Sequence, residues 1–128
     1  TTLLEDATVP RSMLAETFSL IERLTKKYAL TVGTFGHAGD GNLHPTVLCD
    51  ERDADEMKRA HAFYDELYEQ VLAWGGTVSG EHGIGIAKKE YLARQIGPGG
   101  VAVMKRIKLA FDPEGILNPG KIFADGQE

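Results

Sequence analysis

Glycine is concentrated in two short windows of this sequence, and no other feature constrains the fold as strongly. The chain has 15 glycines in 128 residues, well above the usual frequency of about 7%. Four lie between Gly33 and Gly41, and five lie between Gly75 and Gly85. Glycine permits tight turns and close backbone approach. Because three of the four histidines lie in or beside these windows, we expect the turns to bring imidazoles together.

The first window predicts a β-hairpin that opposes two histidines. The segment GHAGDGNLHP contains Asp40-Gly41, a strong signal for a two-residue type I′ turn. Such a turn places His37 directly across from His44, and paired residues have Cβ atoms about 4.5–5.5 Å apart. Two imidazoles at this separation can bind one metal ion, although two surface histidines beside a loop would look the same. The register predicts a histidine face with Phe35 and Thr46, and a core face with Val32, Thr34, Leu43 and Val47.

The second window offers further ligands. The segment SGEHGIGIAKKE places Glu81 and His82 between a short strand and a helix. A carboxylate with two imidazoles is a typical donor set for a divalent transition metal with open coordination positions. The fourth histidine, His61, is predicted to be a packing or surface residue of a helix.

The glycines of the second window allow two other interpretations. Gly80, Gly83 and Gly85 before a helix could cradle a phosphate, with Lys88 as an anion contact. Their spacing matches neither G-x-G-x-x-G nor the P-loop pattern, so a nucleotide loop is weakly indicated. A plain turn with a helix cap also explains them.

Hydrophobic periodicity predicts alternating strands and helices. Ser12 is the predicted cap of the first helix, and Asp53 with Glu56 forms a predicted capping box for the second. The order β-α-β-β-α-β predicts one α+β domain over residues 1–128, a ferredoxin-like split βαβ sandwich with an antiparallel sheet plus C-terminal helices. The expected strands are Thr1–Val9, Thr31–Phe35, Leu43–Leu48 and Thr77–Ser79; the expected helices are Ser12–Tyr28, Asp53–Trp74, Ala87–Gln95 and Val101–Phe111.

Charge and composition exclude several classes of protein. Fourteen basic and 19 acidic residues give a net charge of −5, which argues against a nucleic-acid partner. The acidity is concentrated between Asp50 and Glu69, where a solvated helix face is expected. No apolar run approaches the roughly 18 residues of a membrane span, and the start carries no signal-peptide pattern. With Cys49 as the single cysteine, the expected location is the cytoplasm.

Three segments together resemble one family. They are GHAGDGNLHP (Gly36–Pro45), SGEHGIGIAKKEYL (Ser79–Leu92) and MKRIKLAFDPEGILNPGKIF (Met104–Phe123). In this order they resemble the C-terminal domain of the FAD-linked oxidases, which include the glycolate oxidase D-subunit, D-lactate dehydrogenase and D-2-hydroxyglutarate dehydrogenase. The resemblance implies a substrate- and metal-binding domain whose FAD is held mainly by an FAD-binding domain of the same polypeptide. Other oxidase subunits are further implied partners.

The resemblance also implies a reaction and its residues. His37, His44 and Glu81 match the metal ligands of the family, and His82 matches its general base. A divalent Zn, Mn or Fe ion would bind the substrate hydroxyl and carboxylate. His82 would remove the hydroxyl proton while hydride leaves C2 for the flavin, which converts a 2-hydroxy acid to a 2-oxo acid.

Other positions match the family more loosely. Lys88, Asn118 and Lys121 correspond to cofactor-binding positions, and Asn42 and Thr46 are the expected substrate contacts. Family members that act on larger diacids carry asparagine where Thr46 stands, so a small substrate such as glycolate or lactate is favoured.

Two other functions remain open from the residues alone. One is a non-catalytic ferredoxin-like module that binds an anion or a partner through its glycine loops. The other is a small metal-dependent hydrolase or lyase without flavin. An FAD-binding domain upstream of Thr1 would distinguish both from the flavoenzyme.

Overall fold

The computed structural model describes residues 1–123, which form two compact units. The first unit is Thr1–His82, and the second begins at Gly83. The boundary therefore falls within the second glycine window. The single domain over residues 1–128 that the sequence predicts stays a prediction.

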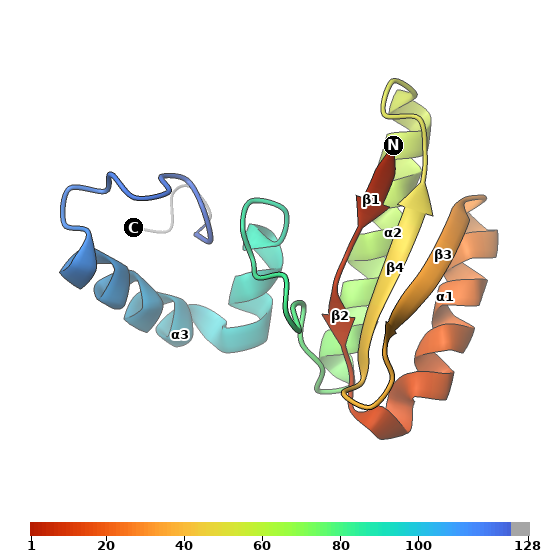
Figure 1. The fold of residues 1–128 in the computed structure, drawn as a ribbon, viewed down its shortest axis with the longest axis horizontal. Helices are drawn as coiled ribbons and strands as arrows, with labels where there is room; N and C mark the ends of the chain where they lie inside the picture. Colours follow the sequence, from red (N-terminus) through yellow and green to blue (C-terminus); the bar gives the residue numbers. More distant parts are fainter. Residues whose placement is uncertain (124–128) are drawn as a thin grey trace. The chain divides into compact units, whose positions relative to one another are not determined.

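The first unit contains an antiparallel sheet of β1 (Thr2–Leu4), β2 (Ala7–Thr8), β3 (Thr31–His37) and β4 (Asn42–Leu48). β4 lies at its centre (Figure 1). β3 pairs along one side of β4, while β1 and β2 pair one after the other along its opposite side. Thr77 adds a single antiparallel bridge to Thr8 of β2, where the sequence predicts a short strand over Thr77–Ser79. The predicted α+β class with an antiparallel sheet is confirmed.

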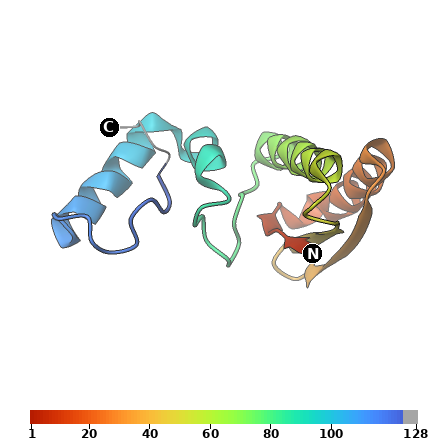
Figure 2. The ribbon, with the colours of Figure 1, turned by 90° about the horizontal axis from the view of Figure 1, so that it is seen from above.

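Helices α1 (Leu14–Tyr28) and α2 (Ala54–Ala73) cover one face of this sheet (Figure 2). Between helices and sheet lies a core of fully buried apolar side chains. No helix of this unit covers the opposite face, where Phe35 remains 58% exposed. The core includes Val47, Phe63, Leu67, Val71 and Val78.

The predicted helix caps are partly wrong. Asp53 does cap α2, because its carboxylate accepts from the backbone N–H groups of Asp55 and Glu56. Glu56 instead accepts from the N–H of Asp50, so the reciprocal half of the box is missing. Ser12 caps nothing: it lies in a 3-10 turn over Arg11–Met13 that leads into α1.

The acidic stretch forms a largely solvated face of α2, as predicted. Asp55, Asp65 and Glu69 are exposed. Glu66 accepts hydrogen bonds from the Lys27 ammonium and the Tyr28 hydroxyl and so connects α2 to α1.

The hairpin register differs from the prediction by two residues. His37 pairs with Asn42 and Phe35 pairs with His44, so the predicted direct pairing of His37 with His44 is wrong. The turn is longer than the predicted two residues, because His37 and Asn42 are the last paired residues. Within it the N–H of Asp40 donates to the carbonyl of His37 at 2.9 Å. A shift of two residues preserves the side-chain alternation. Both histidines therefore still lie on the same face.

Gly41 is required by this longer turn, which gives a test of the register. Gly41 has φ 77°, and a Cβ there would lie 2.1 Å from the carbonyl oxygen of Val9. We expect Gly41→Ala to lower the free energy of unfolding by about 2 kcal/mol, measured by urea denaturation. Gly39→Ala is the matched control, because a Cβ at Gly39 meets no atom within 4 Å. Equal effects of the two substitutions would contradict the observed turn.

The second unit contains α3 (Lys89–Phe111), which is interrupted at Gly97. Gly97 has φ 69° and ψ 168°, so two helical segments meet there, which agrees with the two separate helices that the sequence predicts over Ala87–Gln95 and Val101–Phe111. After α3, the Asp112 carboxylate accepts from the N–H groups of Ile116 and Leu117 and shapes the following turn. Within residues 1–123, no helix combines the length and apolar character that crossing a bilayer requires.

Candidate functional site

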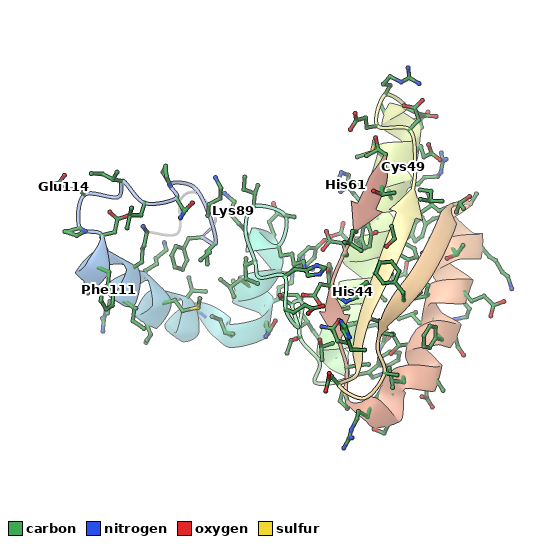
Figure 3. All side chains as sticks on the ribbon, in the orientation of Figure 1. His44, Cys49, His61, Lys89, Phe111 and Glu114 are labelled. Atoms are coloured by element: carbon green, nitrogen blue, oxygen red, sulfur yellow. The ribbon has the colours of Figure 1, made fainter. Side chains whose placement is uncertain are left out.

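The candidate site lies on the uncovered face of the sheet in the first unit. His37 ends β3, and Glu81 follows the Thr77 bridge on an irregular segment. His44 lies within β4 (Figure 3). Glu81 Oε1 is 3.1 Å from His37 Nε2 and 2.9 Å from His44 Nε2. The three potential ligand atoms all lie within 4.8 Å of one another. The residues of the expected metal set are thus close together, although their roles stay a prediction.

The three side chains differ greatly in exposure. The His44 side chain is 4% exposed, whereas those of His37 and Glu81 are 56% and 49% exposed. The cluster therefore has one buried anchor and one side open to solution. This is the form expected of a site that keeps a position for a ligand.

His82 lies beside this cluster. Its ring stacks on that of His44 with centroids 4.8 Å apart and an interplanar angle of 10°. Its Nε2 is 3.9 Å from Glu81 Oε1, and the side chain is 38% exposed. An imidazole in this position can reach a molecule bound at the open side of the cluster. His61, by contrast, is an exposed residue of α2 away from the cluster (Figure 3).

A buried carboxylate that the sequence analysis did not identify holds the Glu81 segment. Asp6 is fully buried. Its Oδ2 accepts from the Ser79 hydroxyl at 2.9 Å and from three consecutive backbone N–H groups, those of Gly80, Glu81 and His82, at 2.8, 2.9 and 2.8 Å. Burial opposes ionisation of Asp6, but the N–H groups of His82 and Glu81 and the other donors outweigh it and hold the pKa well below its usual range.

The donor set fits a divalent transition metal. Two imidazole nitrogens and one carboxylate oxygen suit Zn, Mn or Fe better than Ca or Mg, which prefer oxygen ligands alone. Among the described residues, His44 Nδ1 is buried without a hydrogen-bond partner and lies 4.0 Å from Asp6 Oδ1. A carboxylate behind a ligating imidazole is a common arrangement in metal sites.

The two expected substrate contacts lie in different surroundings. Thr46 is half-buried on the histidine face, and its hydroxyl donates to the carbonyl of His44 at 3.4 Å. Asn42 is only 5% exposed, and its Nδ2 donates to Asp6 Oδ1 at 2.9 Å. Gly80 passes directly over it, since a Cβ at Gly80 would lie 1.8 Å from Asn42 Nδ2.

The expected cofactor contacts all belong to the second unit. Asn118 and Lys121 line a largely apolar cavity of about 370 Å³ together with Ile107 and Phe123, among others. Lys88 immediately precedes α3 and is only 4% exposed. The structure therefore brings Asn118 and Lys121 together, while cofactor binding by the three residues stays a prediction.

Comparison with known proteins assigns the family. The chain is 51% identical over 124 residues to glycolate oxidase subunit GlcD of Bacillus subtilis, covering 97% of this chain and 26% of that protein. It is 42% identical over 118 residues to a D-lactate dehydrogenase of Anaerostipes hadrus, covering 91% of this chain and 25% of that protein. The chain thus spans about a quarter of the length of these relatives. Residues 1–122 match the family described as FAD linked oxidases, C-terminal domain, and the chain belongs to that family.

Proposed function

We propose that residues 1–128 are the substrate- and metal-binding C-terminal domain of an FAD-dependent 2-hydroxy acid dehydrogenase. The enzyme oxidises a 2-hydroxy acid to a 2-oxo acid. The observation that carries this proposal is the convergence of His37 and His44 on Glu81, with the His82 ring beside them. Two imidazoles, a carboxylate and a neighbouring base suit metal-assisted deprotonation of a hydroxyl group.

Each residue then has a separate task. His37, His44 and Glu81 hold a divalent Zn, Mn or Fe ion, which when bound supplies a Lewis acid for the substrate hydroxyl and carboxylate. His82 receives the hydroxyl proton on its ring nitrogen. FAD, held mainly by another domain of the same polypeptide, supplies the acceptor for the hydride from C2.

A small 2-hydroxy acid is the proposed substrate. Thr46 lies beside His44, and its single hydroxyl proton is donated to the His44 carbonyl, so it is a poorer partner for a second carboxylate than the NH₂ group of an asparagine. The exposed Phe35 ring is 5.5 Å from the His44 ring and borders the same surface with an apolar group. Glycolate and lactate fit these surroundings. The names of two relatives, glycolate oxidase subunit and D-lactate dehydrogenase, support the same class of substrate.

The second unit is proposed to contribute to the flavin site. The cavity lined by Asn118 and Lys121 is mostly apolar, which suits contact with an aromatic ring system that has polar edges. Lys88 is the third proposed contact. Because relatives are named as subunits of glycolate oxidase, other oxidase subunits are proposed partners.

The proposed topology of the first unit is the ferredoxin-like split βαβ sandwich. Its support is the order of the sheet, in which Thr77, the β1 and β2 segments, β4 and β3 follow one another. This order places the β1 and β2 segments and β4 at the centre, and Glu81 lies beside His37 at the hairpin end of β3.

Metal removal tests the proposed function. The intact flavoenzyme should lose at least about 90% of its glycolate or D-lactate oxidation on dialysis against a chelator, because the substrate hydroxyl would lose its Lewis acid. Readdition of Zn, Mn or Fe should restore turnover. The flavin absorbance serves as the control and should not change. Full turnover by protein shown to be metal-free would contradict the proposal.

A further inference from the structure

We propose that Asp6 is a positioning residue that assembles the two halves of the metal centre. This inference rests on the proposed function, since it assigns Asp6 a role toward the metal held by His37, His44 and Glu81. Asp6 itself is fully buried, so it does not reach the solvent-exposed side of the cluster. Its role is to fix where the ligands lie.

The first half that Asp6 fixes is the Glu81 segment. Neither a helix nor a strand holds residues 79–82, and the Glu81 side chain is half exposed. Three consecutive N–H groups converge on Asp6 Oδ2, an arrangement that sets the backbone path of an irregular segment around an anion. The position of Glu81 relative to the histidines therefore depends on this carboxylate.

The second half is β4. The pairings Leu4 with Thr46 and Ala7 with Leu43 place Asp6 opposite His44 in the register. Asp6 Oδ1 lies 4.0 Å from His44 Nδ1. A negative charge at that point favours the tautomer with its proton on Nδ1, which leaves Nε2 as the ligand atom facing Glu81.

The role requires a carboxylate and excludes its isosteric amide. Asp6 receives donors at both oxygens, Asn42 Nδ2 at Oδ1 and the Ser79–His82 donors at Oδ2. An asparagine at position 6 would have to direct its own NH₂ group at one of these donor sets in either orientation. A buried donor facing another donor loses its hydrogen bond and is costly.

The test compares metal affinity and segment order in the intact protein. Asp6→Asn should weaken Zn²⁺ binding by about 10- to 100-fold in calorimetric titration, and amide exchange of residues 80–82 should become faster. The double variant Asp6→Asn with Asn42→Asp should recover part of the affinity, because it reverses the donor and acceptor on both side chains. Leu67→Ala is the control for stability alone, since Leu67 is fully buried in the core; it should leave Zn²⁺ affinity unchanged.

The outcomes separate this inference from the proposed function. Wild-type protein that does not bind Zn²⁺, Mn²⁺ or Fe²⁺ at all would contradict the proposed function. Wild-type protein that binds, with Asp6→Asn binding equally well, would overturn the role of Asp6 alone. If Asp6→Asn does not fold, Ser79→Ala removes one donor to Oδ2 and should weaken Zn²⁺ binding several-fold; unchanged affinity would overturn the inference.

Discussion

Replacing His82 with alanine should lower kcat for 2-hydroxy acid oxidation by a factor of about 100 to 10,000, the range that general-base groups contribute. The His82 ring lies beside the cluster and stacks on His44, so its loss removes the proposed proton acceptor. The backbone N–H of residue 82 remains and still donates to Asp6. The Glu81 segment should therefore stay in place, and the flavin content of the intact enzyme should not change.

Two controls make this experiment specific. His61→Ala removes an exposed imidazole of α2 that lies apart from the cluster and should not affect turnover. Added imidazole should partly restore activity to His82→Ala, because the alanine leaves space on a partly exposed side of the site. Undiminished turnover by His82→Ala would remove His82 from the proposed mechanism.

The shared face of the two histidines was predictable from the sequence, but their pairing was not. Alternation along two strands assigns His37 and His44 to one face, and a register error of two residues leaves that assignment intact. The turn itself depends on Gly41, which meets the carbonyl of Val9. Val9 is far from Gly41 in sequence, so local turn preference at Asp40-Gly41 could not reveal this contact.

Asp6 was missed for a related reason. It lies between β1 and β2 with no motif around it, and its partners Ser79–His82 are more than 70 residues away. The only local sign of a buried functional group was an acidic residue within the predicted strand Thr1–Val9. Such a residue is buried only when donors surround it, and the fold alone supplies those donors.

The start of α1 shows the limit of capping rules. Ser12 has the right side chain and precedes an amphipathic helix, yet Arg11–Met13 form a 3-10 turn and Met13 takes the position before the helix. Asp53 obeys the rule because its own backbone is extended, with φ −88° and ψ 101°, and its carboxylate accepts from the N–H groups of Asp55 and Glu56. The break at Gly97 was predictable, because Gly97-Pro98 excludes a continuous helix through local backbone preferences alone.

Glu81→Gln should weaken binding of Zn²⁺ or Mn²⁺ by more than the roughly 10- to 100-fold that loss of a supporting partner costs. Glutamine keeps the size of the side chain, and the backbone N–H of residue 81 can still donate to Asp6. What it removes is the one carboxylate in the cluster of His37, His44 and Glu81. A neutral amide oxygen is a weak ligand for a transition metal beside two imidazoles.

The matched control for this substitution is Glu69→Gln, which removes the same charge from an exposed position on α2. Both variants change the net charge of the chain equally, so any general electrostatic effect on cation binding appears in both. Calorimetric titration of the intact protein, with metal content measured after dialysis, should show loss of the site only for Glu81→Gln. Equal affinities for the two variants would mean that Glu81 is not a metal ligand, and the convergence of the two histidines on its carboxylate would then reflect hydrogen bonding alone.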